Sequence, residues 1–263
     1  MKKSSKNVMK IVALLLCLVL ATSSIVSTTL AKFVVTKDAT TSIKFDTFGL
    51  QIDVDTKLSQ TGIVQKGDSA TITYNSLSMR PGATEDNVLR FYLTKNQPNV
   101  PVNLVVKVEV DTHDDCYVDE TGLVGNSPAA FMPIAFKVGT VDSLTATTWT
   151  QKGKTDAFIS ASNCENLNTA IENALATQIA TAMGGTSSGN TVTKAFDRAN
   201  GTGAVPAVTF ADSKLGISFG FEWPLNAGNV TNNDLIETYI ANRLDGTAPI
   251  TITYTVSFEQ KGA

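Results

Sequence analysis

Alternation of apolar and polar residues with a period of two dominates the chain from residue 70 onward. In three segments, Val102–Val110, Leu215–Trp223 and Ile250–Phe258, every second residue is apolar and those between them are mostly small or polar. Successive side chains of a strand point to opposite faces, so this pattern predicts strands with one face buried and one in water.

Shorter segments complete the same pattern. They are separated by polar turn sequences such as Arg80-Pro81-Gly82 and Asn96-Gln97-Pro98. Four short strands are predicted: Ala70–Asn75, Leu89–Lys95, Ile134–Val138 and Val208–Phe210. Strands with one apolar and one hydroxyl-rich face are typical of antiparallel sheets packed as a sandwich. We therefore expect an all-β protein, an antiparallel β-sandwich.

Two segments have a helical period instead. Between Leu167 and Met183 an apolar residue recurs every fourth position, and Gly184-Gly185 follows. This predicts an amphipathic helix that ends at the glycines and packs its apolar stripe on the sandwich. A second, short helix is predicted over Asp234–Arg243. The Gly-, Ser-, Thr- and Asn-rich segment Gly184–Gly203 is expected to be a mobile loop.

The N-terminus has the pattern of an export signal. A basic stretch (Lys2, Lys3, Lys6, Lys10) precedes the apolar run Ile11–Ala21, and hydroxyl residues lead to Thr29-Leu30-Ala31. Small residues at these positions suit a signal peptidase, so residues 1–31 are predicted as a signal peptide cleaved between Ala31 and Lys32. The alternative is an uncleaved membrane anchor over Ile11–Ala31, which its six hydroxyl residues fit poorly.

The apolar positions change phase just after the predicted cleavage site. Phe33, Val35, Ile43 and Phe45 are at odd positions, whereas Phe48, Leu50, Ile52 and Val54 are at even ones. One regular strand cannot turn both sets toward one core. Two explanations remain: a bulged first strand within a single sandwich, which the sequence alone favours, or an N-terminal arm over residues 32–47 that pairs with another subunit. The domain proper then covers residues 48–263.

Charge and cysteine content limit the function further. Of 21 basic residues, four lysines belong to the signal, which leaves 17 against 24 acidic residues and a net charge of −7. An acidic chain argues against nucleic acid or an anionic membrane as a partner, and we expect no membrane attachment after cleavage. Cys116 and Cys164 remain in the mature chain. In an exported protein they form one disulfide or stay as two thiols, and spacing does not decide.

Four motifs, which follow one another along most of the chain, resemble the motifs of one protein family. They are Thr29-Leu30-Ala31 before Lys32-Phe33; Lys37–Thr40 leading to Phe48–Ile52; Leu77–Gly82 before Val100–Val110; and Phe221-Glu222-Trp223-Pro224-Leu225 before Asn233–Thr238. The chain is similar to the TasA/camelysin-type exported proteins of Gram-positive bacteria, whose signals are removed by a dedicated signal peptidase. The region Thr145–Gly203, with its helix and Cys164, departs from the pattern.

The resemblance implies a jelly-roll-like β-sandwich and a secreted or cell-surface protein that builds biofilm matrix fibres. In fibre-forming members the mature N-terminus inserts into the next subunit as a donor strand. Carried over to this chain, the contact residues are Phe33, Val35, Ile43 and Phe45. The implied partners are further copies of the chain in a head-to-tail fibre, the signal peptidase, and other matrix or cell-surface components.

Two other functions are open from the sequence: a surface adhesin or accessory matrix protein that does not polymerise, and a camelysin-like metal-dependent endopeptidase. The chain has one histidine, His113, and no His-Glu-x-x-His, whereas a hydrolytic zinc site needs about three protein ligands. We therefore predict no catalytic site, cofactor or metal. The exposed row Thr251, Thr253 and Thr255 could bind carbohydrate, but β-propensity alone accounts for it.

Overall fold

The computed structural model describes residues 52–56, 61–66, 69–74, 81–93, 101–112, 117–118, 130–142, 148–196, 210–211, 214–225, 238 and 250–261. All of them belong to one compact unit, Ser42–Ala263. The predicted signal peptide (residues 1–31), the predicted arm (residues 32–47), His113 and Cys116 lie outside the described residues. Within the described part, no helix has the length and apolar character needed to cross a membrane.

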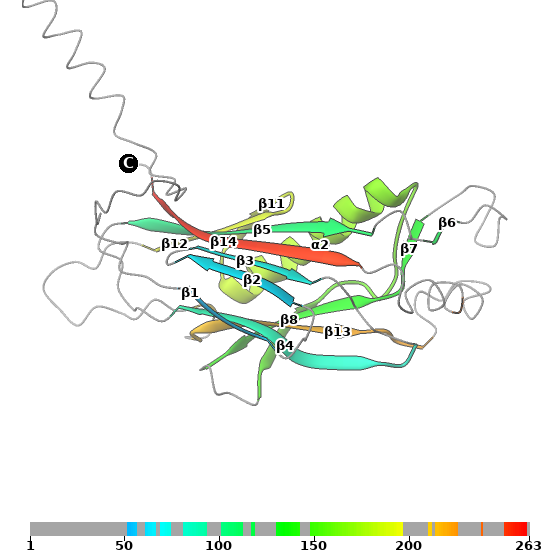
Figure 1. Cartoon of the computed structure of the whole chain (residues 1–263), viewed down its shortest axis with the longest axis horizontal. Helices are drawn as coiled ribbons and strands as arrows, with labels where there is room; N and C mark the ends of the chain where they lie inside the picture. The colour runs from blue at the N-terminus through cyan, green and yellow to red at the C-terminus, as the bar shows by residue number, and fades with distance from the viewer. Residues whose placement is uncertain are drawn as a thin grey trace, which may run out of the picture. The chain divides into compact units, whose positions relative to one another are not determined.

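The described strands form three antiparallel sheets, of which two are large and stack as layers (Figure 1). Sheet A has the order β1 (Ile52–Thr56), β4 (Thr84–Leu93), β13 (Gly216–Glu222), β8 (Ala135–Val141) and β9 (Thr150–Lys154). Sheet B has the order β11 (Thr186–Ser188), β12 (Thr191–Phe196), β5 (Val102–Asp111), β14 (Thr251–Gln260), β3 (Ser69–Tyr74) and β2 (Thr61–Lys66). A small third sheet has the order β10 (Ile159–Ala161), β7 (Ala130–Met132) and β6 (Tyr117–Val118).

The strand order of the two large sheets is that of a jelly roll. Eight strands taken in chain order (β3, β4, β5, β8, β9, β12, β13, β14) pair first with last, second with seventh, third with sixth and fourth with fifth. This nested pairing puts β3, β14, β5 and β12 in sheet B, and β4, β13, β8 and β9 in sheet A. The expected antiparallel, jelly-roll-like β-sandwich is confirmed.

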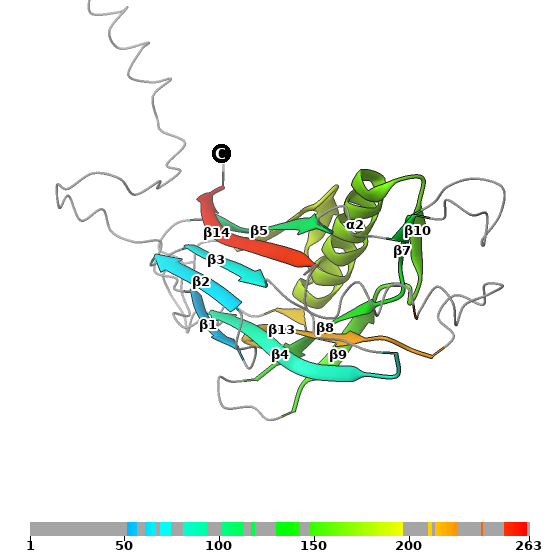
Figure 2. The same ribbon diagram turned by 45° about the vertical axis from the view of Figure 1, so that its right-hand side comes forward.

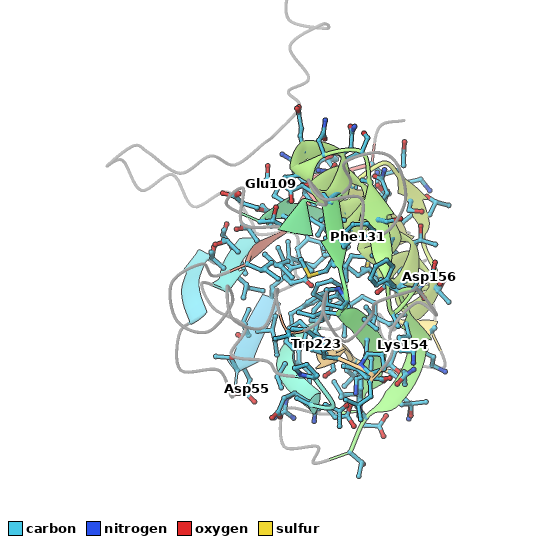
Figure 3. The ribbon with its side chains drawn as sticks, turned by 90° about the vertical axis from the view of Figure 1, so that its right-hand side faces the viewer. Asp55, Glu109, Phe131, Lys154, Asp156 and Trp223 are labelled. Carbon is cyan, nitrogen blue, oxygen red and sulfur yellow. The ribbon has the colours of Figure 1, made fainter. Side chains whose placement is uncertain are left out.

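The alternation seen in the sequence builds the core between the two sheets. Val102, Leu104, Val106, Val108 and Val110 of β5 all turn inward, as do Ile217, Phe219 and Phe221 of β13. The rings of Phe219 in sheet A and Tyr254 in sheet B pack with centroids 4.4 Å apart. Trp223 follows β13 and is fully buried, as predicted from its place in the pattern. Figure 3 shows how densely side chains fill this interior.

Helix α2 (Cys164–Met183) matches the predicted amphipathic helix. Its apolar stripe, Leu167, Ile171, Leu175, Ile179 and Met183, is fully buried, and each such side chain stabilises the fold by about 1.5–3 kcal/mol. Asn163 caps the first turn by accepting a bond from the Asn166 N–H at 2.8 Å, and Gly184 ends the helix in a left-handed conformation. The helix contacts strands of both sheets, on the side away from β1 and β2 (Figure 2).

Three expectations need comment. The loop expected over Gly184–Gly203 is wrong for residues 186–196, which form the hairpin β11–β12 around a two-residue turn at Gly189-Asn190. Gly189 has a φ of 56°, the left-handed conformation that a Gly-Asn hairpin turn requires. The hydrogen bonds between β11 and β12 therefore order this segment despite its polar composition. Phe210 is not in a strand. Of the predicted short helix, only Thr238 is described, and it is helical.

Candidate functional site

The two outer faces of the sandwich carry the polar side chains, and they differ in character. On sheet A, polar residues lie on the outer face and are nevertheless buried. We call this the buried face; it comprises Asn87, Arg90, Tyr92, Lys137, Val141 and Ser218, each at most 7% exposed. Buried polar groups need partners, because an unsatisfied one costs about 1–3 kcal/mol.

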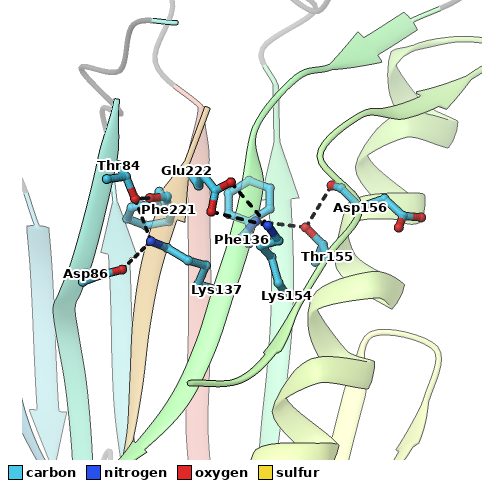
Figure 4. Close-up of polar contacts among 9 residues, drawn as sticks. All are labelled: Thr84, Asp86, Phe136, Lys137, Lys154, Thr155, Asp156, Phe221 and Glu222. Atoms are coloured by element: carbon cyan, nitrogen blue, oxygen red, sulfur yellow. Dashed lines mark hydrogen bonds and ion pairs between the residues drawn. The ribbon is translucent and has the colours of Figure 1, made fainter. Parts of the chain in front are cut away.

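Lys137 links β8 to β4 across the intervening strand β13 on the buried face (Figure 4). It lies on β8 with its side chain 5% exposed, and its ammonium donates to Thr84 Oγ1 at 2.7 Å and pairs with Asp86 on β4. Between these strands runs β13, which has Gly220 opposite Lys137. A Cβ added at Gly220 would lie 2.6 Å from the Glu85 carbonyl oxygen, so only glycine fits beneath β4.

A bulge in β4 explains this close approach. The β4–β13 register shifts between Phe219 and Phe221, which leaves extra residues in β4 opposite Gly220. Asn87 lies in the bulge with a φ of 55°, a left-handed conformation that asparagine tolerates better than most residues. Its side-chain oxygen accepts a bond from Ser218 Oγ at 2.7 Å, and both residues are buried. The strained position is thus fixed by a buried hydrogen bond.

Trp149, just before β9, covers two glycines of the same face. A Cβ on Gly139 would lie 2.5 Å from both Trp149 Cε3 and the Thr150 carbonyl oxygen, and a Cβ on Gly220 would lie 3.3 Å from Trp149 Cη2. The six-membered ring therefore extends over β8 and β13. Trp149 itself is only partly exposed, so this arrangement is a cover for the glycines.

Two more ion pairs belong to sheet A. Arg90 on β4 bonds Asp55 on β1 at 2.8 Å, with side chains 9% and 43% exposed, and Lys154 on β9 approaches Glu222 on β13 at 3.3 Å. Burial raises the pKa of the Tyr92 phenol above its usual value, and the charge of nearby Arg90 offsets part of this effect. Sheet A is therefore held together by links between strands that are distant in sequence.

The outer face of sheet B is rich in hydroxyls, and it also carries Val105, Asp111 and Glu259. We call its hydroxyl-bearing part the hydroxyl face; it comprises Thr71, Thr73, Thr191, Thr193, Thr253, Thr255 and Ser257, with Lys107 and Glu109 at its centre. Cross-strand register aligns these residues in rows: one contains Thr71, Thr255, Lys107 and Thr191, and the next contains Thr73, Thr253 and Glu109. Every member is half-buried or exposed.

Helix α2 completes one margin of sheet B. The Val108 N–H, toward the end of β5, donates to Asn190 O at 2.9 Å. The Val110 N–H lies beyond the last residue of β5 that pairs with β12, and it donates to Glu172 Oε1 of α2, also at 2.9 Å. On sheet A, the end of the Gln178 side chain of α2 lies directly against Gly153 of β9, where an added Cβ would be 1.9 Å from Gln178 Oε1. A helix thus covers strand backbone that would otherwise be open to another chain.

The residues predicted to act as a site are only partly described. Ala31, Lys32, Phe33, Val35, Ile43 and Phe45 lie outside the described residues, as do His113 and Cys116. Cys164, the first residue of α2, is disulfide-bonded. Its partner also lies outside the described residues, so the pairing with Cys116 stays a prediction. In the described ranges, no group of three or more His, Cys, Asp or Glu residues is placed to hold a metal ion.

Sequence reasoning missed the links across the buried face, because Lys137 and its partners are about fifty residues apart in the chain. It identified the alternate threonines along strand β14, but not the threonines of β3 and β12 that lie on the same face of the sheet. Comparison with known protein families, curated proteins and solved structures finds no match to this chain.

Proposed function

We propose that this protein is a secreted structural protein whose subunits assemble into extracellular fibres, with the N-terminal arm of one subunit (residues 32–47) added as a strand to the next. The fibres would belong to the matrix or surface of a Gram-positive bacterium. The proposal joins the export signal, the phase change after it and the resemblance to matrix fibre proteins with the sandwich fold.

The observation that carries the proposal is the position and phase of β1. Ile52 is fully buried and Val54 packs against the core, so these two even-numbered residues of β1 face inward. The odd-numbered set of the arm cannot continue this strand and face the same core. In addition, β1 is an edge strand of sheet A among the described strands. A segment that precedes a marginal strand is well placed to reach a neighbour.

Strand addition explains both affinity and specificity in such a contact. Main-chain hydrogen bonds hold the added strand, and pockets for alternate side chains select it, here Phe33, Val35, Ile43 and Phe45. Each subunit donates at one place and accepts at another, and such a head-to-tail contact extends into an open filament. Cleavage after Ala31 would free the arm, which couples assembly to export.

Electron microscopy of two purified versions tests the proposal: one that begins at Lys32 and one that begins at Ile43. We expect filaments from the longer version alone, while circular dichroism shows the same β-rich fold in both. The shorter version is the longer one without Lys32–Ser42, so any difference between the two comes from that segment. Filaments from both versions would place the contact outside the arm, and single particles from both would favour a non-polymerising adhesin.

A further inference from the structure

The hydroxyl face is self-complementary in its charges. Lys107 and Glu109 are two residues apart on β5 and pair at 2.6 Å, with side chains 48% and 50% exposed. Both point to the same side of the sheet, about 6.8 Å apart along the strand. A two-fold axis lying in the contact plane, perpendicular to β5 and level with Val108, would place Lys107 of one copy opposite Glu109 of another, and the reverse.

We propose that the hydroxyl face binds the hydroxyl face of a second copy of this chain about such an axis, and that this contact pairs fibres side by side. The pairing of fibres rests on the proposed function; the contact between two copies does not. An isologous contact of this kind uses the same residues on both partners.

The hydroxyl rows fit the same axis. The row that contains Thr71, Thr255 and Lys107 would face the row that contains Thr73, Thr253 and Glu109 of the other copy. Threonine hydroxyls both donate and accept, and Thr73 and Thr253 already lie with their hydroxyls 3.3 Å apart within one chain. Each hydroxyl row would therefore meet a row able to bond with it.

The size of the face is adequate for a specific but weak contact. The strands of sheet B that form it, β3, β14, β5 and β12, contain 6, 10, 10 and 6 residues. At about 3.4 Å per residue and about 4.8 Å between strands, they project to roughly 500 Å². Standard interfaces bury about 800 Å² per partner, so one contact would be weak, and repetition along a fibre would strengthen it.

Charge favours a second copy over a polyanion. The cation at the centre of the face is already balanced by Glu109, and the mature chain has a predicted net charge of −7. Two acidic chains repel each other unless the surfaces in contact are close to neutral or carry reciprocal pairs. The centre of the hydroxyl face meets both conditions.

Charge reversal tests the contact on the full secreted chain. We would prepare Lys107→Glu, Glu109→Lys and a 1:1 mixture of these two variants. Glu85→Lys makes the same charge change as Glu109→Lys at an exposed position of sheet A and is the control for that variant. Negative-stain microscopy gives the fraction of fibres that run in lateral pairs, and circular dichroism confirms folding.

We expect lateral pairs in wild type and in Glu85→Lys, a drop of at least about tenfold in each single hydroxyl-face variant because both reciprocal pairs become repulsive, and recovery in the mixture. Single variants that pair like wild type, a mixture that does not recover, or wild-type fibres that stay single would overturn the inference. Pairing that appears only after a neutral polysaccharide is added would also overturn it.

Absence of any fibres would count against the proposed function instead. The same proteins would then be compared by sedimentation velocity. Dimers in wild type and in the mixture, with monomers in each single variant, would still support the contact; monomers throughout would reject it.

Discussion

The two outer faces of this sandwich carry similar polar residue types in different environments, buried on sheet A and in contact with water on sheet B. On sheet A, the buried side chains Lys137, Arg90 and Ser218 bond to residues of other strands: Lys137 to Asp86, Arg90 to Asp55 and Ser218 to Asn87. On sheet B, threonines and the Lys107–Glu109 pair stay in contact with water. Polar residues on the buried face therefore contribute to stability, whereas those on the hydroxyl face are free to contribute to association.

The largest expected difference is at the glycines of the buried face. In Gly139→Ala the new Cβ would lie 2.5 Å from the Thr150 carbonyl oxygen, a backbone atom that cannot rotate away. We expect the free energy of unfolding to fall by about 2–3 kcal/mol, measured by urea denaturation. Thr193→Ala on the hydroxyl face is the control and should change it by less than about 0.5 kcal/mol. Equal effects would mean that the two faces do not differ in packing.

Matched lysine substitutions sharpen the contrast. Lys137→Met keeps the length of the buried side chain but removes its bonds to Thr84 and Asp86, and should lower stability by about 1–2 kcal/mol. Lys107→Met removes the exposed pair with Glu109 and should change stability by at most about 0.5 kcal/mol. A Lys137→Met protein as stable as wild type would show that the links across β13 contribute little.

High pH should destabilise the folded protein in part through Tyr92 of the buried face. Burial raises the pKa of Tyr92, so the folded state keeps the phenol neutral while the unfolded chain ionises it above about pH 10. The associated stability is complete below that pH and is lost as the pH rises further. Tyr92→Phe should therefore lose less stability than wild type between pH 9 and about pH 11 in thermal melts. Parallel pH profiles for the two proteins would contradict this.

The smallest effect is expected within the hydroxyl face. Thr73 and Thr253 face each other across β3 and β14, and replacing either by alanine should change stability by at most about 0.5 kcal/mol. The two hydroxyls are in contact and share one interaction, so the double variant should lose no more than about 1 kcal/mol in total. A larger loss in denaturation curves would mean that the face is needed for folding.

How much the sequence predicts depends on the range of the interaction. Strands β5, β13 and β14 and helix α2 were predictable because alternation and four-residue spacing are local patterns. The start of β4 was placed five residues late, at Leu89 instead of Thr84, because the bulge around Asn87 breaks the alternation. The hairpin β11–β12 had a usable signal in Gly189-Asn190, which the polar composition around it obscured.

The buried face was not predictable in the same way. Lys137, Gly220 and Asp86 are ordinary residues in the sequence, and their joint role appears only when β8, β13 and β4 are neighbours in a sheet. The same holds for the rows of the hydroxyl face, whose members come from β3, β5, β12 and β14. Register across strands is a tertiary property that one strand's pattern does not contain.

The position of β14 has a consequence for when the protein can fold. This strand lies between β5 and β3 and pairs along its ten residues with β5 (Figure 1). Both neighbours precede it by more than a hundred residues, so sheet B stays in two pieces until residues 251–260 are available. Pairing of strands so far apart in the sequence is slow, because the entropy of closing a long loop is lost before any stabilising contact forms. Completion of sheet B is therefore expected to be a late step in folding, whereas every described strand of sheet A precedes β14 in the chain.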